Sequence, residues 1–271
     1  MSELGDFLRS RRALLSPDEV GLTSYGARRR VPGLRREELA QLAGVSAAYY
    51  TRLEQGQSQN ASDAVLDAIA RALRLGEDER AHLRNLARPA RPRRPARAEP
   101  VRPAARQLIE AMDAVPAVIL DRRNDVLAWN RLGHAVVAGH VPFEERPNLL
   151  RLLFLDERAR AMYTEWDEEA RLAVASLRMV AAAHPDDRRL AELIGELSVK
   201  SPEFTAIWAK HPVRTCTFGV KRLAHPVAGD LELSFENMLL PDESGQRVIL
   251  YNAPSGSPTR NALDMLGVMA S

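Results

Sequence analysis

Apolar residues recur every three or four positions through the first third of the chain, which is typical of short amphipathic helices. Val65, Leu66, Ile69, Ala70 and Leu73 form the clearest of these stripes. Serines in N-cap position and glycines after the last turn mark the helix ends. The pattern predicts five helices, over residues 4–15, 35–43, 46–55, 62–73 and 77–87, with an irregular basic stretch over 16–33 that contains Arg28, Arg29 and Arg30.

The rest of the chain mixes helical spacing with alternating, strand-like runs. Strands are predicted over residues 117–121, 126–129, 215–223, 231–240 and 247–252. Helices are predicted over residues 104–115, 131–138, 149–154, 156–183, 186–197 and 202–210, and a last helix begins after Ser257 and Pro258. Two strands, several helices and three further strands predict an α+β domain with one antiparallel sheet.

A proline- and arginine-rich stretch separates these two patterns. Residues 88–103 hold five prolines and six arginines, which remove backbone donors and apolar anchors together. We interpret the stretch as a solvated basic tether, with contact to DNA phosphates as the alternative. The sequence therefore predicts a helical domain over residues 1–87, a linker over 88–104 and an α+β domain over 105–271.

Charge is divided unevenly between these domains. The chain has a net charge of +2, but residues 1–106 contain 20 arginines against 13 acidic residues, and the remainder holds 18 basic and 23 acidic side chains. A basic first domain suits a phosphate-bearing partner. No apolar run is long enough to span a membrane, no secretory signal is recognised, and the single Cys216 excludes an internal disulfide. We therefore expect no membrane partner and a cytoplasmic location.

Two of the predicted helices flank a Gly44-Val45-Ser46 turn, as in helix-turn-helix proteins. On a helical wheel, Tyr50 and Leu53 lie about 60° apart and define the buried face of the second helix. The opposite face predicts contacts with duplex DNA, because arginine and glutamine bond base edges and methyl groups contact thymine. Glu54 is instead expected to pair with an arginine inside the domain. The DNA-binding candidates are Arg36, Ala48, Tyr49, Thr51, Arg52 and Gln55.

The first domain resembles the lambda-repressor-like, Xre-type helix-turn-helix family. The resemblance is carried by Glu38-Leu39-Ala40, the Gly44 turn and residues 52–56, which read Arg-Leu-Glu-Gln-Gly. The resemblance implies an all-α domain in which the second helix of the helix-turn-helix motif enters the major groove of DNA. Arg36 stands where the family usually has a glutamine, so we expect it to bind phosphate by charge. A bare helical bundle is the alternative.

The second domain lacks the sequence motifs of catalysis. Its histidines show no metal-ligand spacing, and it contains neither a nucleophile elbow nor a phosphate-binding glycine loop. Asp186 and Asp187 open a predicted helix, where capping explains them. We therefore expect no catalytic residue, no metal and no cofactor, and we predict that the chain is not an enzyme.

The predicted helix over residues 156–183 places aromatic side chains on one face and Arg171 and Arg178 on a flank. One interpretation is an amphipathic helix whose arginines reach solvent. The other is an apolar tunnel with arginine at its mouth, which suits a long-chain carboxylate. The residues alone leave both interpretations open.

The whole chain resembles the MmyB-like regulators, in which an Xre-type helix-turn-helix precedes a PAS-like ligand-binding domain. The matching stretches are residues 126–130, 148–154, 201–208, 221–226 and 256–258, together with Trp166. The resemblance implies a fatty-acid-like ligand in the second domain. Core packing of Trp129 and helix capping by Asn130 are the alternatives to ligand contact. The ligand-binding candidates are Trp129, Asn130, Phe154, Tyr163, Trp166, Arg171 and Arg178.

These observations predict a sequence-specific DNA-binding transcription regulator that acts as a homodimer. A ligand in the second domain would alter the placement of two helix-turn-helix units, whose half-sites lie about 34–36 Å apart or a multiple of that. The alternative is a regulator whose second domain is a protein-interaction platform without a small-molecule ligand.

Overall fold

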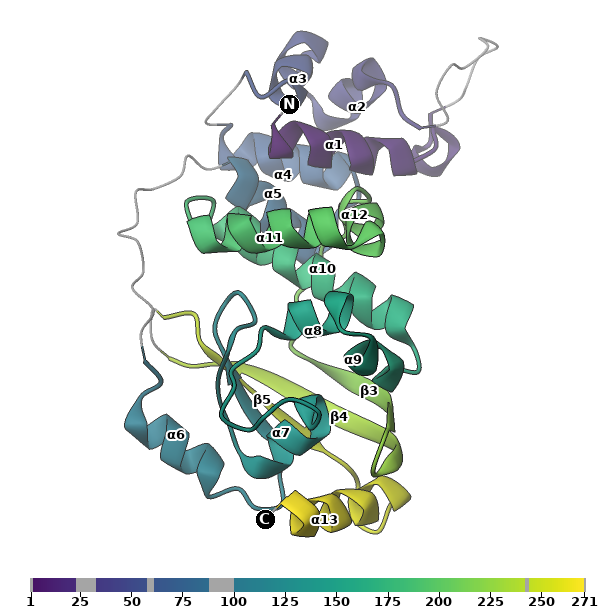
Figure 1. The fold of residues 1–271 in the computed structure, drawn as a ribbon. Helices are drawn as coiled ribbons and strands as arrows, with labels where there is room; N and C mark the ends of the chain where they lie inside the picture. Colours follow the sequence, from purple (N-terminus) through teal and green to yellow (C-terminus); the bar gives the residue numbers. More distant parts are fainter. Residues whose placement is uncertain (1, 23–32, 58–60, 88–99, 242–243, 271) are drawn as a thin grey trace.

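The computed structural model describes residues 2–22, 33–57, 61–87, 100–241 and 244–270. Helices from the N-terminal part of the chain gather at one end of the molecule, and a sheet with its own helices forms the rest (Figure 1). The predicted Arg28-Arg29-Arg30 cluster and most of the predicted linker lie outside the described residues. The division into residues 1–87, 88–104 and 105–271 therefore stays a prediction.

The elements that the structure describes in the N-terminal part are all helices, and they share a hydrophobic core. Large side chains from several helices fill this core, among them Phe7, Leu39, Tyr50 and Ile69. Ser46 caps its helix by accepting a hydrogen bond from the backbone N–H of Tyr49. The elements are α1 (Glu3–Leu14), the 3-10 helix η1 (Asp18–Val20), α2 (Arg36–Ala43), α3 (Ala47–Glu54), α4 (Asp63–Ala72) and α5 (Glu77–Ala87).

The C-terminal part is an α+β domain with one antiparallel sheet, as the alternation of strand and helix patterns predicts. Its five strands lie in the order β2-β1-β5-β4-β3. The strands are β1 (Ala117–Leu120), β2 (Val126–Trp129), β3 (Phe218–His225), β4 (Gly229–Leu239) and β5 (Arg247–Asn252). The helices are α6 (Pro103–Glu110), α7 (Arg131–Ala138), α8 (Leu149–Leu155), α9 (Glu157–Met162), α10 (Trp166–Ala183), α11 (Arg188–Lys200), α12 (Pro202–Trp208) and α13 (Pro258–Ala270).

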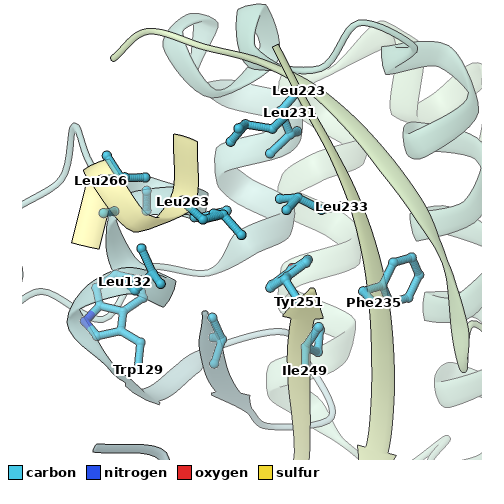
Figure 2. Close-up of a cluster of buried hydrophobic side chains, with 14 of the residues drawn as sticks. Trp129, Leu132, Leu223, Leu231, Leu233, Phe235, Ile249, Tyr251, Leu263 and Leu266 are labelled. Atoms are coloured by element: carbon cyan, nitrogen blue, oxygen red, sulfur yellow. The ribbon is translucent and has the colours of Figure 1, made fainter. Parts of the chain in front are cut away.

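Helices cover both faces of this sheet. On one face, α6 packs over β1 and β2 through Ile109. On the other face, Leu231 and Leu233 of β4 lie on the side that faces Leu263 and Leu266 of α13, as Figure 2 shows. A separate apolar cluster joins α8, α10, α11 and α12 between the sheet and the N-terminal helices (Figure 1).

The prediction of one continuous helix over residues 156–183 is wrong. The chain leaves helical geometry at Tyr163, which forms an isolated antiparallel bridge with Leu223 of β3. Thr164 donates from its backbone N–H and its hydroxyl to the carbonyl oxygen of Arg222. Pairing with the edge of the sheet replaces intrahelical hydrogen bonds here, so the predicted helix becomes α9 and α10.

Candidate DNA-reading helix and ligand cavity

Helix α3 presents a polar surface at the end of the molecule that lies away from the sheet (Figure 1). Tyr50 and Leu53 are fully buried, which fixes the orientation of this helix in the core. Their burial leaves the predicted reading face outward. Ala48, Arg52 and Gln55 are exposed, whereas Tyr49 and Thr51 are partly buried.

Glu54 is buried within the N-terminal core and is held by two arginines. Arg12 donates from Nε to Glu54 Oε1 at 2.8 Å, and Arg36 donates from Nε to Glu54 Oε2 at 2.7 Å. Burial alone would raise the pKa of Glu54, but the hydrogen bonds from Arg12 and Arg36 lower it below its ordinary value. The expected pairing of Glu54 inside the domain is therefore confirmed. Arg36 keeps 42 % of its side-chain surface exposed beside α3.

Two of the predicted ligand-binding residues lie beside α6, α7 and α13. Trp129 is buried and donates from Nε1 to the carbonyl oxygen of Phe143 at 3.1 Å. Asn130 caps α7 by accepting from the backbone N–H of Gly133 and also donates to the carbonyl oxygen of Val115. Both border an open surface hollow of about 820 Å³ with charges of both signs on its wall.

Four other predicted ligand-binding residues lie on or near α8 and α10. Phe154 and Trp166 meet edge to face in the apolar cluster of these helices, with ring centroids 5.7 Å apart. Arg171 is exposed and pairs with Glu168. Arg178 is buried, lies over the ring of Trp208 and donates to the carbonyl oxygen of that residue. Trp166, Arg171 and Tyr163 border an open surface hollow of about 740 Å³. Tyr163 also lines a smaller cavity, and none of the other four side chains lines that one.

That cavity lies between the sheet and helices α8 and α10 and has a volume of about 90 Å³. Leucines form much of its wall, and charged and hydrogen-bonding groups also line it. Such a mixture of apolar walls and a few convergent polar groups is typical of ligand sites. The polar lining consists of Asn124, Tyr163, Glu169, Ser176, Cys216, Lys221, Asn237, Arg247 and Tyr251.

Lys221 and Glu169 form an ion pair on the cavity wall. Nζ of Lys221 donates to Oε1 of Glu169, and only 13 % and 21 % of the two side chains are exposed. Burial is the largest single influence and lowers the pKa of Lys221, but Glu169, Tyr163 and Tyr251 together raise it by more, so the net shift is upward. Lys221 therefore stays charged in the folded protein.

A second cation and an unpartnered acceptor complete the polar side of the cavity. Arg247 donates to the carbonyl oxygen of Asp121 and to Oδ1 of Asn124, and burial lowers its pKa. Two cations thus face the cavity against the single carboxylate of Glu169. Asn237 donates to the carbonyl oxygen of Cys216, while its own Oδ1 has no hydrogen-bond partner among the described residues.

Sequence reasoning missed Lys221, Glu169 and Arg247, although one signal was present. In β3 the alternation brings Gly219, Lys221 and Leu223 to the same face of the sheet, and Leu223 is buried in the core. A lysine at an inward position of a strand is unusual unless it has a partner. The partner, Glu169, is 52 residues away in the sequence, so the pair itself could not be read from spacing.

The described parts of the chain contain no helix that is long and apolar enough to cross a membrane. Within the same residues, no group of three or more histidine, cysteine, aspartate or glutamate side chains is arranged to hold a metal ion.

Comparison with known protein families gives two matches. A helix-turn-helix domain matches residues 3–83, which contain α1 to α4 and most of α5. The MmyB-like transcription regulator ligand binding domain matches residues 101–266, more than half of the chain and nearly all of its α+β part. No curated protein matches the chain. A helix-turn-helix domain followed by this ligand-binding domain is the architecture of a transcription regulator, and the chain belongs to the family of MmyB-like transcription regulators.

Proposed function

We propose that this protein is a cytoplasmic, homodimeric regulator that reads a specific DNA sequence through α3 and responds to a fatty-acid-like ligand in the cavity beside Tyr163. The observation that carries the proposal is the cavity itself, which is lined by Lys221, Arg247 and a single, partly buried carboxylate, that of Glu169. An unbalanced positive charge beside leucine walls suits a molecule with an anionic head and an apolar tail.

The DNA-reading role rests on the exposed face of α3. Arg52 and Gln55 are exposed there, and we propose that they contact base edges, while Ala48, Tyr49 and Thr51 border the groove. Arg36 already bonds Glu54 through one nitrogen, and we propose that its exposed part binds phosphate.

A selection from random duplexes followed by salt-dependent binding tests this division of roles. Arg52→Ala should cost roughly 1–3 kcal/mol of specific binding free energy and relax one base position. Arg36→Ala should weaken all sequences alike and lower the salt slope by about one unit. An unchanged selected site with Arg52→Ala would contradict the proposed orientation.

The ligand's head is the best-defined part of the proposal. A carboxylate can pair with Lys221 and Arg247, whose combined charge exceeds that of Glu169. The free Oδ1 of Asn237 can accept a hydrogen bond from a hydroxyl group on the ligand. The apolar tail would lie along leucines of α8 and α10, including Leu152, Leu153 and Leu172.

The size of the cavity sets a condition on the tail. A volume of about 90 Å³ is below the roughly 300 Å³ at which ligand pockets usually begin. A long tail can therefore enter only if α8 or α10 shifts away from the sheet. Each buried methylene contributes about 0.8 kcal/mol, which is the free energy available to drive such a shift.

Calorimetric titration of straight-chain carboxylic acids of graded length tests the ligand class. Affinity should rise from hexanoate to dodecanoate and fall when the carboxylate is replaced by a neutral alcohol. Affinity that is independent of both length and charge would exclude this ligand class. The protein-interaction platform would then be the better account of the second domain.

The proposed homodimer has a candidate surface on the sheet. Phe218, Val220 and Met238 are exposed. The register of β3, β4 and β5 places them on the same face of the sheet that α6 covers over β1 and β2. Two copies joined through this face about a two-fold axis that runs from the sheet end to the α3 end would keep both α3 helices at the same end, as binding to adjacent half-sites requires. Sedimentation of the full chain should give a dimer, and Phe218→Glu should give a monomer; a wild-type monomer would contradict the proposal.

A further inference from the structure

Residues 211–216, between α12 and β3, contact both the helix-turn-helix region and the ligand cavity. Val213 packs against the N-terminal hydrophobic core. Thr215 donates from its backbone N–H to Asp78 Oδ2 at 2.9 Å and from its hydroxyl to Asp78 Oδ1 at 2.6 Å. The next residue, Cys216, lines the cavity. One peptide unit therefore separates a contact to the first domain from the ligand site.

The start of this segment is also held by the first domain. The guanidinium of Arg11 in α1 donates to the carbonyl oxygen of His211 at 2.6 Å and pairs with Glu79 of α5. His211 has a positive φ of 51°, a conformation that non-glycine residues adopt only when their surroundings hold them. Both ends of the segment are thus fixed to α1 and α5.

Helix α10 forms a parallel connection between the same two places. Glu169, Ala173 and Ser176 of α10 line the cavity, and α10 packs against α5 of the first domain. Two residues after Ser176, Arg178 is buried beside Trp208, at the end of α12 from which residues 211–216 follow. The cavity wall and the docking surface for the first domain are therefore parts of the same two chain segments.

We propose that residues 211–216, together with α10, convert occupancy of the cavity into a change in how the helix-turn-helix domain is docked. The inference rests on the proposed function, because it takes the cavity beside Lys221 as the ligand site. A ligand tail larger than the present cavity must displace a segment that lines it. Two of these segments, α10 and residues 211–216, also contact the first domain. Contacts of Asp78 with Thr215 and of Arg11 with His211 are the ones that would change.

The docked arrangement leaves α3 free, so ligand binding need not uncover the DNA-reading surface. Helix α3 lies at the outer end of the first domain, with α5 between it and α10 (Figure 1). The change would instead alter the position of α3 relative to the sheet. In a dimer that position sets the separation of the two reading helices, which must match the half-site spacing.

The only cysteine in the chain, Cys216, gives a direct readout of this connection. It is partly buried in the cavity wall, and burial raises the pKa of its thiol, so it should react slowly with a maleimide at pH 7. Asp78→Ala removes the contact with Thr215 at a site in the first domain. We expect it to raise the maleimide rate at Cys216 about fivefold or more, the lower end of typical couplings between sites.

Glu77→Ala is the matched control. Glu77 precedes Asp78 in the first turn of α5, so its removal costs the same favourable charge at the helix N-terminus, but its side chain is exposed. The control should leave the rate at Cys216 unchanged. A second variant, Thr215→Val, removes the hydroxyl bond from the other side and should not add to the effect of Asp78→Ala when the two are combined.

The reverse direction uses dodecanoate as the probe and hydrogen exchange in α5 of the full-length protein as the readout. Coupling between two sites is reciprocal. Dodecanoate should therefore change the hydrogen-exchange rates of α5. Asp78→Ala should in turn change dodecanoate affinity by the same factor by which bound dodecanoate changes the docking equilibrium of the first domain. An equal maleimide rate in Asp78→Ala and the wild type would overturn the connection even if dodecanoate binds. If instead dodecanoate neither binds nor protects Cys216 while Asp78→Ala still raises the rate, the ligand class fails and the connection stands.

Discussion

Two carboxylates that are largely shielded from solvent, Glu54 and Glu169, have similar partners and different surroundings. Glu54 in the helix-turn-helix domain is held by Arg12 and Arg36, and it lines none of the cavities described above. Glu169 in the ligand-binding domain pairs with Lys221 and lines a cavity of about 90 Å³ that Arg247 also lines. Buried ion pairs alone are therefore not evidence of a ligand site. The space and the excess charge beside Glu169 are what distinguish it.

The same comparison explains why the two pairs differ in expected function. Two arginines around Glu54 satisfy its oxygens and join α1, α2 and α3, so that the pair orients α3, the helix proposed to read DNA. Lys221 has one acceptor in Glu169 and can exchange it for a ligand carboxylate without leaving an uncompensated cation. A salt bridge whose carboxylate can be replaced by one from a ligand suits reversible binding.

Removing Glu54 should have the largest effect on stability. Glu54→Ala leaves Arg12 buried without its carboxylate, and breaking a buried pair by removing one partner costs about 3–5 kcal/mol of unfolding free energy. Chemical denaturation followed by circular dichroism measures the loss. Glu37→Ala, at an exposed position in α2, should change stability by less than about 0.5 kcal/mol. A small loss with Glu54→Ala would show that the two pairs are alike.

A further titratable group, His82 of α5, is buried near Arg178 and has no carboxylate partner in the described residues. Burial first, and then the charges of Arg178 and Arg11, lower the pKa of His82 to about 3. The unfolded chain binds this proton near pH 6.5, so the contribution of neutral His82 to stability is complete above that pH. It should be lost as the pH falls from about 6.5 toward 3.

Denaturation of the wild type and His82→Gln across this range tests the sign. The wild type should lose several kcal/mol more than the variant between pH 6.5 and pH 3, because about 1.4 kcal/mol accompanies each pKa unit. All other titrating groups contribute equally to both proteins. Parallel pH profiles would mean that His82 is not held in its neutral form by the fold.

Removing the charge of Lys221 and removing the charge of Glu169 should change ligand affinity in opposite directions. Lys221→Met removes the cation and should weaken dodecanoate binding by at least about tenfold, or 1.4 kcal/mol. Glu169→Gln removes the competing carboxylate and should strengthen the same binding. Lys200→Met is the control, since Lys200 forms an exposed pair with Glu196 on α11. Equal affinities in Lys221→Met and Glu169→Gln would place the ligand's head elsewhere.

The smallest effect is expected at Arg171, a residue that the sequence suggested for the ligand site. Its side chain is 56 % exposed and pairs with Glu168 one turn earlier. Pairs of this kind contribute less than about 1 kcal/mol. Arg171→Ala should therefore leave both stability and dodecanoate affinity nearly unchanged. A tenfold loss of affinity would return Arg171 to the site.

Local signals in the sequence predicted much of the fold. Ser46, Ser62 and Asn130 were readable as helix caps because a cap acts on the residues that follow it directly. The buried face of α3 was readable for the same reason, since Tyr50 and Leu53 belong to one turn of one helix. The resemblance to known families supplied the order of the domains.

What the sequence could not predict depends on contacts between distant segments. The break at Tyr163 comes from its bridge with Leu223, 60 residues later, and helical spacing on both sides of the break conceals it. The cavity charges come from α10, β3 and β5, which only the folded sheet brings together. Arg178 was readable as a charged residue on a helix, but its burial beside Trp208 follows from the placement of α12.

The position of Val213 bears on how such regulators can be recombined. A side chain that belongs to the ligand-binding part of the chain completes the hydrophobic core of the helix-turn-helix part. The two modules therefore do not separate cleanly at the proline-rich stretch between them. In a chimera that joins this ligand-binding domain to another DNA-binding domain, the new DNA-binding domain must supply a hollow that accepts Val213 and an acidic residue in the position of Asp78. Otherwise both halves will fold while the signal between them is lost.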